Sequence, residues 1–410
     1  MTCYEDLMYR GLIKDMTNNE DFVEKLNSGE ITFYWGTDPT ADSLHIGHYS
    51  SLLTAKRLMK YGHKPILLVG GATVLIGDPR PTAEREIIDK NVVLNNIECI
   101  RKQVTELFNG NVEVVNNYDW IKEFSFIDFL RDVGKYINVN YMLNKDIISR
   151  RLETGITFAE FSYTLLQGYD FVHLYKEKNC IMQAAGSDQW GNITTGVELI
   201  NKMLGKTAYA FTMPLILDAN GNKFGKSEGN ALWLDESKTS SYELYQYLIN
   251  SDDTKVEEYL KVFTFLSKEE IEEVMRKHNE KPELRIAQKT LAKEFITDLH
   301  GEESYNRALK LSEGLFSGNI KEINLDDLLI GLKDMPHFEL KESTLIDLLV
   351  NEKIASSRRE AREFINGNAI SINGDIVNDE NMIINKDTAL DGRVVIIRRG
   401  KKKYFVGSIN

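Results

Sequence analysis

Two histidines three residues apart, His45 and His48, stand in a stretch that could bind phosphate. The stretch 31–51 begins as a β-branched and aromatic run, crosses a polar loop, and continues from His48 with apolar residues at helical spacing. A loop at a helix N-terminus presents N–H groups to an anion, imidazoles donate to phosphate, and Gly47 allows close approach of a flat ligand. An H-x-G-H sequence equally fits a surface connection that happens to contain two histidines.

Two lysines form a second candidate site. Lys223 and Lys226 lie in the glycine-containing stretch 221–227, after an apolar run at 214–217 that predicts a strand. Such ammonium groups can close over a polyphosphate, with the Ser227 hydroxyl as a third donor. Lysine-rich loops are more often only solvated, so the sequence does not exclude the alternative that 221–227 is an ordinary surface loop.

A third candidate combines a helix with a turn. Tyr163, Gln167 and Asp170 recur at i, i+4 and i+7, so they share one face of a helix. Asp188 and Gln189 follow another apolar run, at 181–185. A helix face with three polar groups either lines a polar pocket or meets solvent, and periodicity alone leaves both open.

These residues need strands and helices that bring them together. Apolar runs at 31–35, 64–69, 112–115 and 181–185 alternate with helical stretches up to about residue 220. This alternation predicts an α/β fold, a Rossmann-like domain with a parallel sheet. Glycine-rich turns after the strands then lie at the carboxyl edge of the sheet, where open α/β sheets bind ligands.

The rest of the chain predicts further domains. Charged, helix-forming sequence runs from 252 to about 318, with Ser267 and Glu270 as a capping box. We expect a Rossmann-like catalytic domain at 1–220, a mobile lysine loop with a helical domain at 221–320, a linker at 321–342, and a small α+β domain at 343–410.

Composition limits the class of protein. The 410 residues are 42% hydrophobic and 27% charged, enough for a large core and two or three domains. No uninterrupted apolar window is long enough for a membrane span, and the first residues are polar, so we expect a cytoplasmic protein. The three cysteines form no C-x-x-C pair, which speaks against a disulfide framework and a zinc site.

Charge is unevenly distributed along the chain. The net charge of −12 disfavours a nucleic-acid partner for the chain as a whole. Residues 341–410, however, hold 12 Lys/Arg against 10 Asp/Glu, whereas the remainder holds 38 against 52. The C-terminal region is therefore locally basic, as an RNA-binding segment would be.

The order of these motifs on one α/β pattern resembles that of the bacterial tyrosyl-tRNA synthetases, which are class I aminoacyl-tRNA synthetases. The resemblance extends over essentially the whole chain. Besides the histidine and lysine motifs and S-D-Q-W-G-N at 187–192, it includes G-G-A-T at 70–73, I-G-D-P at 76–79 and R-R-G-K-K-K-Y at 398–404.

The resemblance implies a function and an ATP site. Family members join L-tyrosine to ATP, release pyrophosphate, and pass the tyrosyl group to the terminal adenosine of tRNA(Tyr). Mg²⁺ would accompany ATP without a fixed protein site. The residues implied in ATP binding and catalysis are Gly36, Asp38, Thr40, His45, Gly47, His48, Ser51, Arg85, Gly186, Asp188, Gln189, Lys223, Lys226 and Ser227.

The resemblance also implies the amino-acid and tRNA sites. Tyr34 and Asp170 would flank the substrate phenol, and Asp78, Tyr163 and Gln167 would take its ammonium group. The region 343–410 looks like a small RNA-binding module also found in a ribosomal protein, with tRNA contacts at Arg358, Arg359 and Arg362. Family members are homodimers, and their helical domain lies on the anticodon side of the tRNA.

Two positions depart from the family pattern. Trp35 stands where many members carry a small residue beside the ribose, so we expect it either to crowd that contact or to shift the contact to the backbone. The loop after Asp78 is shorter than the lysine-bearing loop expected there, which leaves Arg85 as the candidate cation for pyrophosphate.

Two other classes of protein share parts of this pattern. Adenylyl- and cytidylyl-transferases carry the histidine motif but need neither the Tyr34 and Asp170 pair nor a basic tail. A non-enzymatic RNA-binding or splicing paralogue would keep the tail and could lose the catalytic groups, yet His45, His48, Lys223 and Lys226 are all present.

Overall fold

The computed structural model describes residues 1–79, 88–152, 155–227, 230–400 and 403–409. The chain forms two compact units. The first comprises Met1–Lys238 with Ser251–Glu294, and the second comprises Thr239–Asn250 with Phe295–Asn410. Among the described residues, no helix is both long and apolar enough to cross a membrane.

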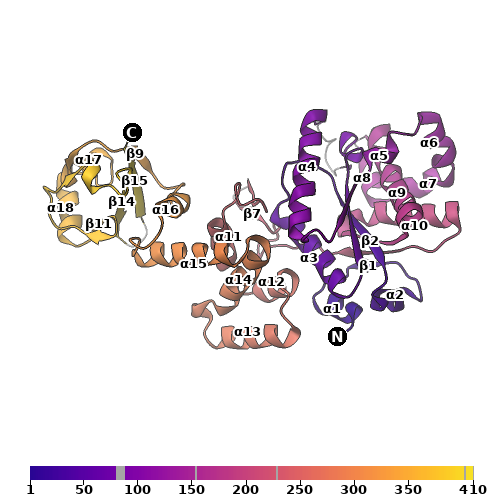
Figure 1. Ribbon diagram of the computed structural model, residues 1–410, viewed down its shortest axis with the longest axis horizontal. Helices are drawn as coiled ribbons and strands as arrows, with labels where there is room; N and C mark the ends of the chain where they lie inside the picture. Colours follow the sequence, from indigo (N-terminus) through magenta and orange to yellow (C-terminus); the bar gives the residue numbers. More distant parts are fainter. Residues whose placement is uncertain (80–87, 153–154, 228–229, 401–402, 410) are drawn as a thin grey trace. The chain divides into compact units, whose positions relative to one another are not determined.

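The first unit is built on a six-stranded sheet with the order β1-β6-β5-β2-β3-β4. Two of its strands, β1 and β2, are labelled in Figure 1. Strands β2 to β6 are parallel and β1 is antiparallel to β6. Four of the strands match the apolar runs expected from the sequence, which confirms the α/β fold class. The strands are β1 (Asp15–Met16), β2 (Thr32–Thr37), β3 (Lys64–Val69), β4 (Glu113–Asn116), β5 (Cys180–Gly186) and β6 (Tyr209–Met213).

Helices cover both faces of this sheet. On β2, the adjacent side chains Tyr34 and Trp35 point to opposite faces: Tyr34 packs on Phe171 of α9, and Trp35 on Phe108 at the end of α4. The helices are α1 (Cys3–Tyr9), α2 (Phe22–Ser28), α3 (Ile46–Lys60), α4 (Lys90–Leu107), α5 (Tyr118–Ile121), α6 (Phe126–Asp132), α7 (Val139–Leu143), α8 (Asp146–Leu152), α9 (Phe158–Lys178), α10 (Trp190–Leu204), α12 (Val256–Phe263) and α13 (Lys268–Glu280).

The prediction of a strand at 214–217 is wrong. The strand lies one segment earlier, at β6, where all five residues are buried. Pro214 follows directly, and because proline cannot donate to a sheet ladder it ends the strand. The next residues instead lead to an isolated pairing of Leu217 with Lys223 and to the short pair β7 (Lys226–Ser227) and β8 (Asn230–Ala231).

The second unit contains helices and a five-stranded sheet with the order β12-β11-β14-β15-β9. Its helices are α11 (Ser241–Ile249), α15 (Glu302–Ser317), α16 (Leu325–Gly331), α17 (Leu345–Asn351) and α18 (Arg358–Asn366). Helix α14 (Ile286–His300) crosses the unit boundary, so the expected helical domain is divided between the units. The strands are β9 (His337–Glu339), β11 (Ile370–Ile372), β12 (Asp375–Ile376), β14 (Val394–Arg399) and β15 (Lys403–Ser408), with β10 (Ser343–Thr344) paired to β13 (Ile383–Ile384).

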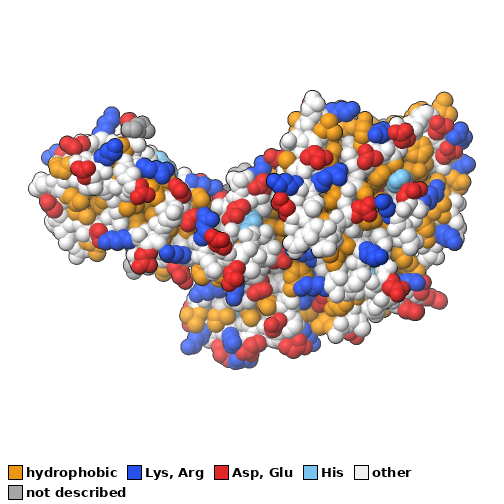
Figure 2. Space-filling model, viewed as in Figure 1, with side chains coloured by type: hydrophobic (Ala, Val, Ile, Leu, Met, Phe, Trp, Pro, Cys, Tyr) orange, Lys and Arg blue, Asp and Glu red, His pale blue; other side chains and the backbone are white. Residues whose placement is uncertain are grey.

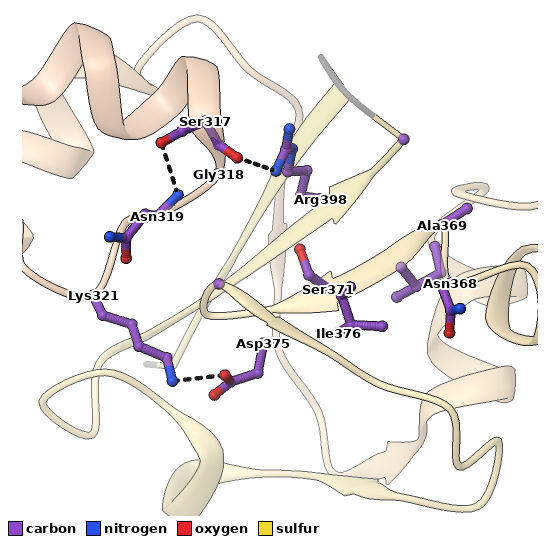
Figure 3. A pocket seen from close by; sticks show the side chains of 13 residues that line it. Ser317, Gly318, Asn319, Lys321, Asn368, Ala369, Ser371, Asp375, Ile376 and Arg398 are labelled. Carbon is purple, nitrogen blue, oxygen red and sulfur yellow. Dashed lines mark hydrogen bonds and ion pairs between the residues drawn. The ribbon is translucent and has the colours of Figure 1, made fainter.

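The segment 321–342 differs from the expected linker. It contains α16 and β9, and β9 pairs in parallel with β15. An apolar cluster joins α15 and α16 to β14 and β15 through Leu311, Leu328 and Ile396. At the end of α15, Arg398 donates to the Ser317 carbonyl (3.2 Å) in the pocket shown in Figure 3. Apolar burial therefore connects this segment to the C-terminal sheet.

Candidate active site

The candidate side chains gather at the carboxyl edge of the first sheet. Strand β2 lies between β3 and β5 in the sheet. Later strands are added beyond β3 on one side of β2, ending at β4, and beyond β5 on the other side, continuing with β6. Such a switch in strand order leaves a crevice at the strand ends, where α/β proteins bind ligands. The turns at these strand ends are hydrogen-bonded to one another: Thr73, after β3, donates to Asp38 and accepts from Asn117, and Gln189, after β5, donates to Asp78.

One end of the crevice is a buried pair of Tyr34 and Asp170, each 1% exposed. Asn117 Nδ2 and Trp120 Nε1 donate to the two carboxylate oxygens of Asp170, at 3.0 and 2.8 Å. The Tyr34 hydroxyl is buried without a hydrogen-bond partner in the part of the chain that the structure describes. A buried hydroxyl without a partner is costly, so the geometry suits a ligand that supplies one.

Burial controls the ionisation of this pair. Burial, and to a smaller extent the nearby carboxylate of Asp38, raise the pKa of Asp170 to about 7, against the lowering effect of the two donated hydrogen bonds. Burial and the carboxylate of Asp170 also raise the pKa of Tyr34 well above its ordinary value. Tyr34 therefore keeps its proton at neutral pH, while Asp170 titrates close to neutrality.

A second carboxylate lies in the same network. Asp38 accepts from the Tyr163 hydroxyl (3.1 Å) and from the Thr73 hydroxyl (2.8 Å). Asn117 Nδ2 also donates to Thr73 (3.2 Å), so one amide group links this carboxylate to Asp170. Although the sequence placed Asp38 with ATP, the structure joins it to Tyr163, a residue implied for the substrate ammonium group.

The third carboxylate, Asp78, faces the turn after β5. Its oxygens accept from Gln189 Nε2 (2.9 Å) and Asn192 Nδ2 (3.2 Å). On the face of α9 that carries Tyr163, Gln167 Oε1 is buried and has no hydrogen-bond partner among the described residues. An unsatisfied carbonyl oxygen suits an ammonium donor.

The two histidines stack at the start of α3. His45 is the N-cap residue, and the ring centroids of His45 and His48 are 3.9 Å apart. Each Nδ1 accepts a backbone N–H, from Gly47 for His45 (3.1 Å) and from His45 for His48 (3.3 Å). These bonds assign the ring proton to Nε2. Burial and the neighbouring His45 lower the pKa of His48 to about 3, so His48 stays neutral.

The lysine loop and the histidine loop are joined by backbone pairing. Ile46 N–H donates to the Leu232 carbonyl (2.8 Å), and Leu232 N–H donates to the Gly225 carbonyl (3.0 Å). Gly225 has φ +88°, and a Cβ there would lie 2.4 Å from Ile46 Cγ1, so only glycine fits. Lys223 is exposed beside this junction.

The remaining candidates are more open to solvent. Gly36, Thr40, Gly47 and Asp188 are exposed, whereas Ser51 and Gly186 are half-buried. Ser51 lies three residues after His48 on α3, and Gly186 ends β5. Arg85 lies outside the described residues, and so do the side chains of Lys226 and Ser227, of which the structure gives only the backbone.

Trp35 does not lie among the polar groups of the crevice. Its side chain is 5% exposed and stacks on Phe108, with ring centroids 5.5 Å apart, on the face of the sheet opposite Tyr34. The structure gives this large residue a packing role, because strand alternation directs it into the core beside α4.

Sequence reasoning missed four polar residues of the crevice: Thr73, Asn117, Trp120 and Asn192. Asn117 is fully buried, and its side-chain oxygen also accepts from Ala72 N–H (2.7 Å). Its one sequence signal is its place directly after the strand predicted at 112–115. Nothing in a single sequence shows that its amide group would reach two carboxylate sites.

The three candidate RNA-binding arginines lie on α18. Arg358, Arg359 and Arg362 are 61%, 90% and 51% exposed and pair with Asp347, Glu363 and Glu380. Figure 2 shows acidic and basic side chains interleaved over the visible face of this region. Exposed ion pairs contribute at most about 1 kcal/mol, so phosphate groups can replace these carboxylates cheaply.

Comparisons with known proteins identify the family of the chain. The family model described as class I tRNA synthetases (W and Y) matches residues 26–317, and the tyrosine--tRNA ligase SYY-like C-terminal domain matches residues 327–407. The chain belongs to the class I tRNA synthetases of the tyrosyl type.

Relatives support the assignment over the full length. The chain is 48% identical over 415 residues to a tyrosine--tRNA ligase of Streptococcus uberis, covering 99% of both chains. A truncated mitochondrial tyrosyl-tRNA synthetase of Aspergillus nidulans superposes with TM-score 0.69 at 32% identity, over 77% of this chain and 94% of that chain. The predicted activity of the family, tyrosine--tRNA ligation with ATP, is confirmed by these likenesses.

Proposed function

We propose that L-tyrosine binds in the crevice with its phenol between Tyr34 and Asp170 and its ammonium group near Gln167. Two buried polar atoms of this site, the Tyr34 hydroxyl and Gln167 Oε1, have no hydrogen-bond partner among the described residues, and they carry this proposal. A phenol can donate to Asp170 and accept from Tyr34, and an ammonium group can donate to Gln167. Tyr163, Asp38 and Asp78 complete the polar surroundings of the ammonium group.

The ATP half of the site lies at the start of α3. His45 and His48 offer Nε2–H donors, and Thr40, Ser51, Gly47 and the turn at 186–189 line the nucleotide. Lys223, with Lys226, Ser227 and Arg85, closes on the departing pyrophosphate. Gly36 leaves room for the nucleotide at the end of β2. Mg²⁺ arrives with ATP and neutralises part of its charge.

No enzyme nucleophile is required. A tyrosine carboxylate oxygen attacks the α-phosphorus, a new O–P bond forms, and the bond between the α-phosphorus and the bridging oxygen breaks to release pyrophosphate. The chain contributes by aligning the two substrates and by placing donors where negative charge develops. The terminal adenosine of tRNA(Tyr) then takes the tyrosyl group and AMP leaves.

Tyrosine-dependent exchange of labelled pyrophosphate into ATP tests the site. We expect exchange with tyrosine and none with phenylalanine or without an amino acid. Exchange without any amino acid would favour a nucleotidylyltransferase, and loss of exchange with intact tRNA binding would favour a non-enzymatic RNA-binding protein. Either result would contradict the proposed site.

Partners and location follow from the same assignment. We assign tRNA phosphate contacts to Arg358, Arg359 and Arg362, and place the protein in the cytoplasm, consistent with its three free cysteines. A homodimer is supported by large apolar side chains exposed on one segment of the first unit. They are Phe126, Ile127, Leu130, Val139, Leu152 and Phe158, on α6 to α9.

A charge placed on this segment should dissociate the dimer. Ile127 is 73% exposed. In a dimer with twofold symmetry, each protomer of an Ile127→Asp protein would place one aspartate in the shared interface. Each lost apolar side chain costs about 1.5–3 kcal/mol, so Ile127→Asp should weaken dimerisation by about 10²-fold or more. Sedimentation equilibrium measures the change. The matched control Leu284→Asp, also exposed but outside this segment, should stay dimeric; a dimeric Ile127→Asp protein would exclude this surface.

A further inference from the structure

A buried arginine lies at the far end of the helix that begins with the two histidines. Arg57 is nine residues after His48 on α3, and its side chain is 2% exposed. At a rise of about 1.5 Å per residue, it stands about 14 Å from His48 along the helix axis. A buried guanidinium is costly unless acceptors surround it, so its contacts show what it holds.

The guanidinium of Arg57 binds the last carbonyl groups of α12. Nη1 donates to the carbonyl of Val262 (3.0 Å), and Nη2 donates to the carbonyls of Lys261 (3.3 Å) and Thr264. Helix α12 ends at Phe263, and the final carbonyls of a helix have no partner within it. A cation at a helix C-terminus also interacts favourably with the helix dipole.

A second arginine strengthens the same attachment. Arg10, buried and paired with Asp6 at 2.7 Å, donates to the carbonyls of Lys261 (2.8 Å), Thr264 (3.2 Å) and Leu266 (2.7 Å). Two guanidinium groups therefore converge on one helix end. Arg57 differs from Arg10 in that its helix also carries the histidines.

The aromatic side chains of α12 hold the lysine loop. The rings of Tyr259 and Phe263 contact the ring of Phe224, with centroids 4.7 and 4.5 Å apart, and Phe224 is buried. The Tyr259 hydroxyl donates to the carbonyl of Leu217 (3.0 Å), the residue that pairs with Lys223. Helix α12 thus fixes the backbone on both sides of the loop that contains Lys223.

We propose that Arg57 is a positioning residue for adenylate formation. Through α12 and Phe224, it sets the position of Lys223 relative to His45 and His48, so that α3 governs both cationic and imidazole donors to ATP. The inference rests on the role proposed above for Lys223. Arg57 itself contacts no substrate in this proposal. Its substitution should therefore change the rate of adenylate formation from ATP and leave tyrosine binding intact.

Replacement of Arg57 should slow adenylate formation without weakening tyrosine binding. A displacement of about 1 Å in a catalytic group can cost about 10²-fold in rate. We expect Arg57→Met to lower kcat for pyrophosphate exchange by about 10- to 10²-fold at saturating tyrosine, with the Kd for tyrosine changed by less than about twofold. Arg57→Lys, which keeps the charge, should recover part of the rate.

A matched control separates positioning from general stability. Arg151 on α8 is also a buried arginine, and it pairs with Glu160 (2.8 Å). Arg151→Met should lower the melting temperature as Arg57→Met does, without the loss of kcat. Equal losses of kcat in both variants, or an unchanged kcat in folded Arg57→Met, would overturn the inference.

Two further variants locate the effect in the loop. Tyr259→Phe removes one hydrogen bond and should lower kcat about 2- to 10-fold, and it carries the test if Arg57→Met does not fold. In a Lys223→Gln background, Arg57→Met should cost much less than in the native chain, because coupled positions are not additive. Two results would contradict the proposal that Arg57 positions Lys223 through α12. One is that the losses of kcat in Arg57→Met and Lys223→Gln are fully additive, and the other is an unchanged kcat in Tyr259→Phe. A Lys223→Gln protein with native kcat would instead refute the role proposed for Lys223.

Discussion

Asp170→Asn should weaken tyrosine binding by about 10- to 10²-fold while the KM for ATP stays within about twofold of the native value. The carboxylate is fixed by Asn117 and Trp120, and the asparagine would turn an amide group toward one of these donors. The phenol of the substrate would then lose a charged acceptor. Equilibrium dialysis with labelled tyrosine, alongside exchange kinetics in ATP, measures both quantities.

Discrimination against phenylalanine should fall in the same variant. A buried acceptor that lacks its partner penalises the substrate without a hydroxyl. Rejection of phenylalanine by tyrosyl-tRNA synthetases, at about 10⁵-fold, is the general example of this effect. Glu160→Gln, another buried carboxylate of the first unit, is the control and should retain tyrosine affinity. Equal losses for tyrosine and ATP in Asp170→Asn would refute the assignment of Asp170 to the phenol.

The same carboxylate should make tyrosine binding depend on pH. Its pKa in the folded protein is about 7, above the ordinary value of 3.8, so it is protonated below neutrality. If only the carboxylate accepts the phenol proton, affinity should fall about tenfold for each pH unit below 7 and level off above about 8. Stability has the opposite dependence on pH. Between about pH 4 and 7, Asp170 is protonated in the folded state and ionised in the unfolded state, so its contribution to the free energy of unfolding decreases as pH rises. Asp170→Asn should remove both dependences.

Charge reversal on α18 should separate tRNA charging from adenylate formation. Arg358, Arg359 and Arg362 are exposed, and each pairs with a carboxylate that a phosphate can replace. Changing all three to glutamate should weaken tRNA binding by about 10²- to 10³-fold and reduce its salt dependence, because fewer counterions are released. Filter binding at two salt concentrations and an aminoacylation assay measure the effect. Pyrophosphate exchange should stay within about twofold of native.

Substitution is a cleaner test than truncation. Removing residues 343–410 would take β14 and β15 away from the apolar cluster that they form with α15 and α16, and would expose that cluster. A matched variant with Lys176, Lys178 and Lys202 changed to glutamate alters the net charge equally on α9 and α10. That variant should charge tRNA normally. Normal charging by the α18 variant would place the tRNA contacts elsewhere.

The sequence by itself determined the elements that local pattern controls. Strand β2, helix α3 and strand β3 follow from apolar periodicity, and the capping box of α13 from Ser267 and Glu270. The helix spacing of Tyr163, Gln167 and Asp170 was enough to place them on one face of α9. The prediction of a strand at 214–217 failed because this apolar run begins with Pro214, which cannot donate to a sheet ladder.

Tertiary structure decided which of these residues meet. Asn117 donates to Asp170 directly and reaches Asp38 through the Thr73 hydroxyl, and no local pattern relates the elements that carry these residues. The pairing of Ile46 with Leu232 brings the histidine and lysine loops together across a long sequence separation. Trp35 is a core residue because Phe108, at the end of α4, stacks on its ring. Local propensity acts over a few residues, whereas burial and hydrogen-bond partners depend on the whole fold, so only the structure could supply them.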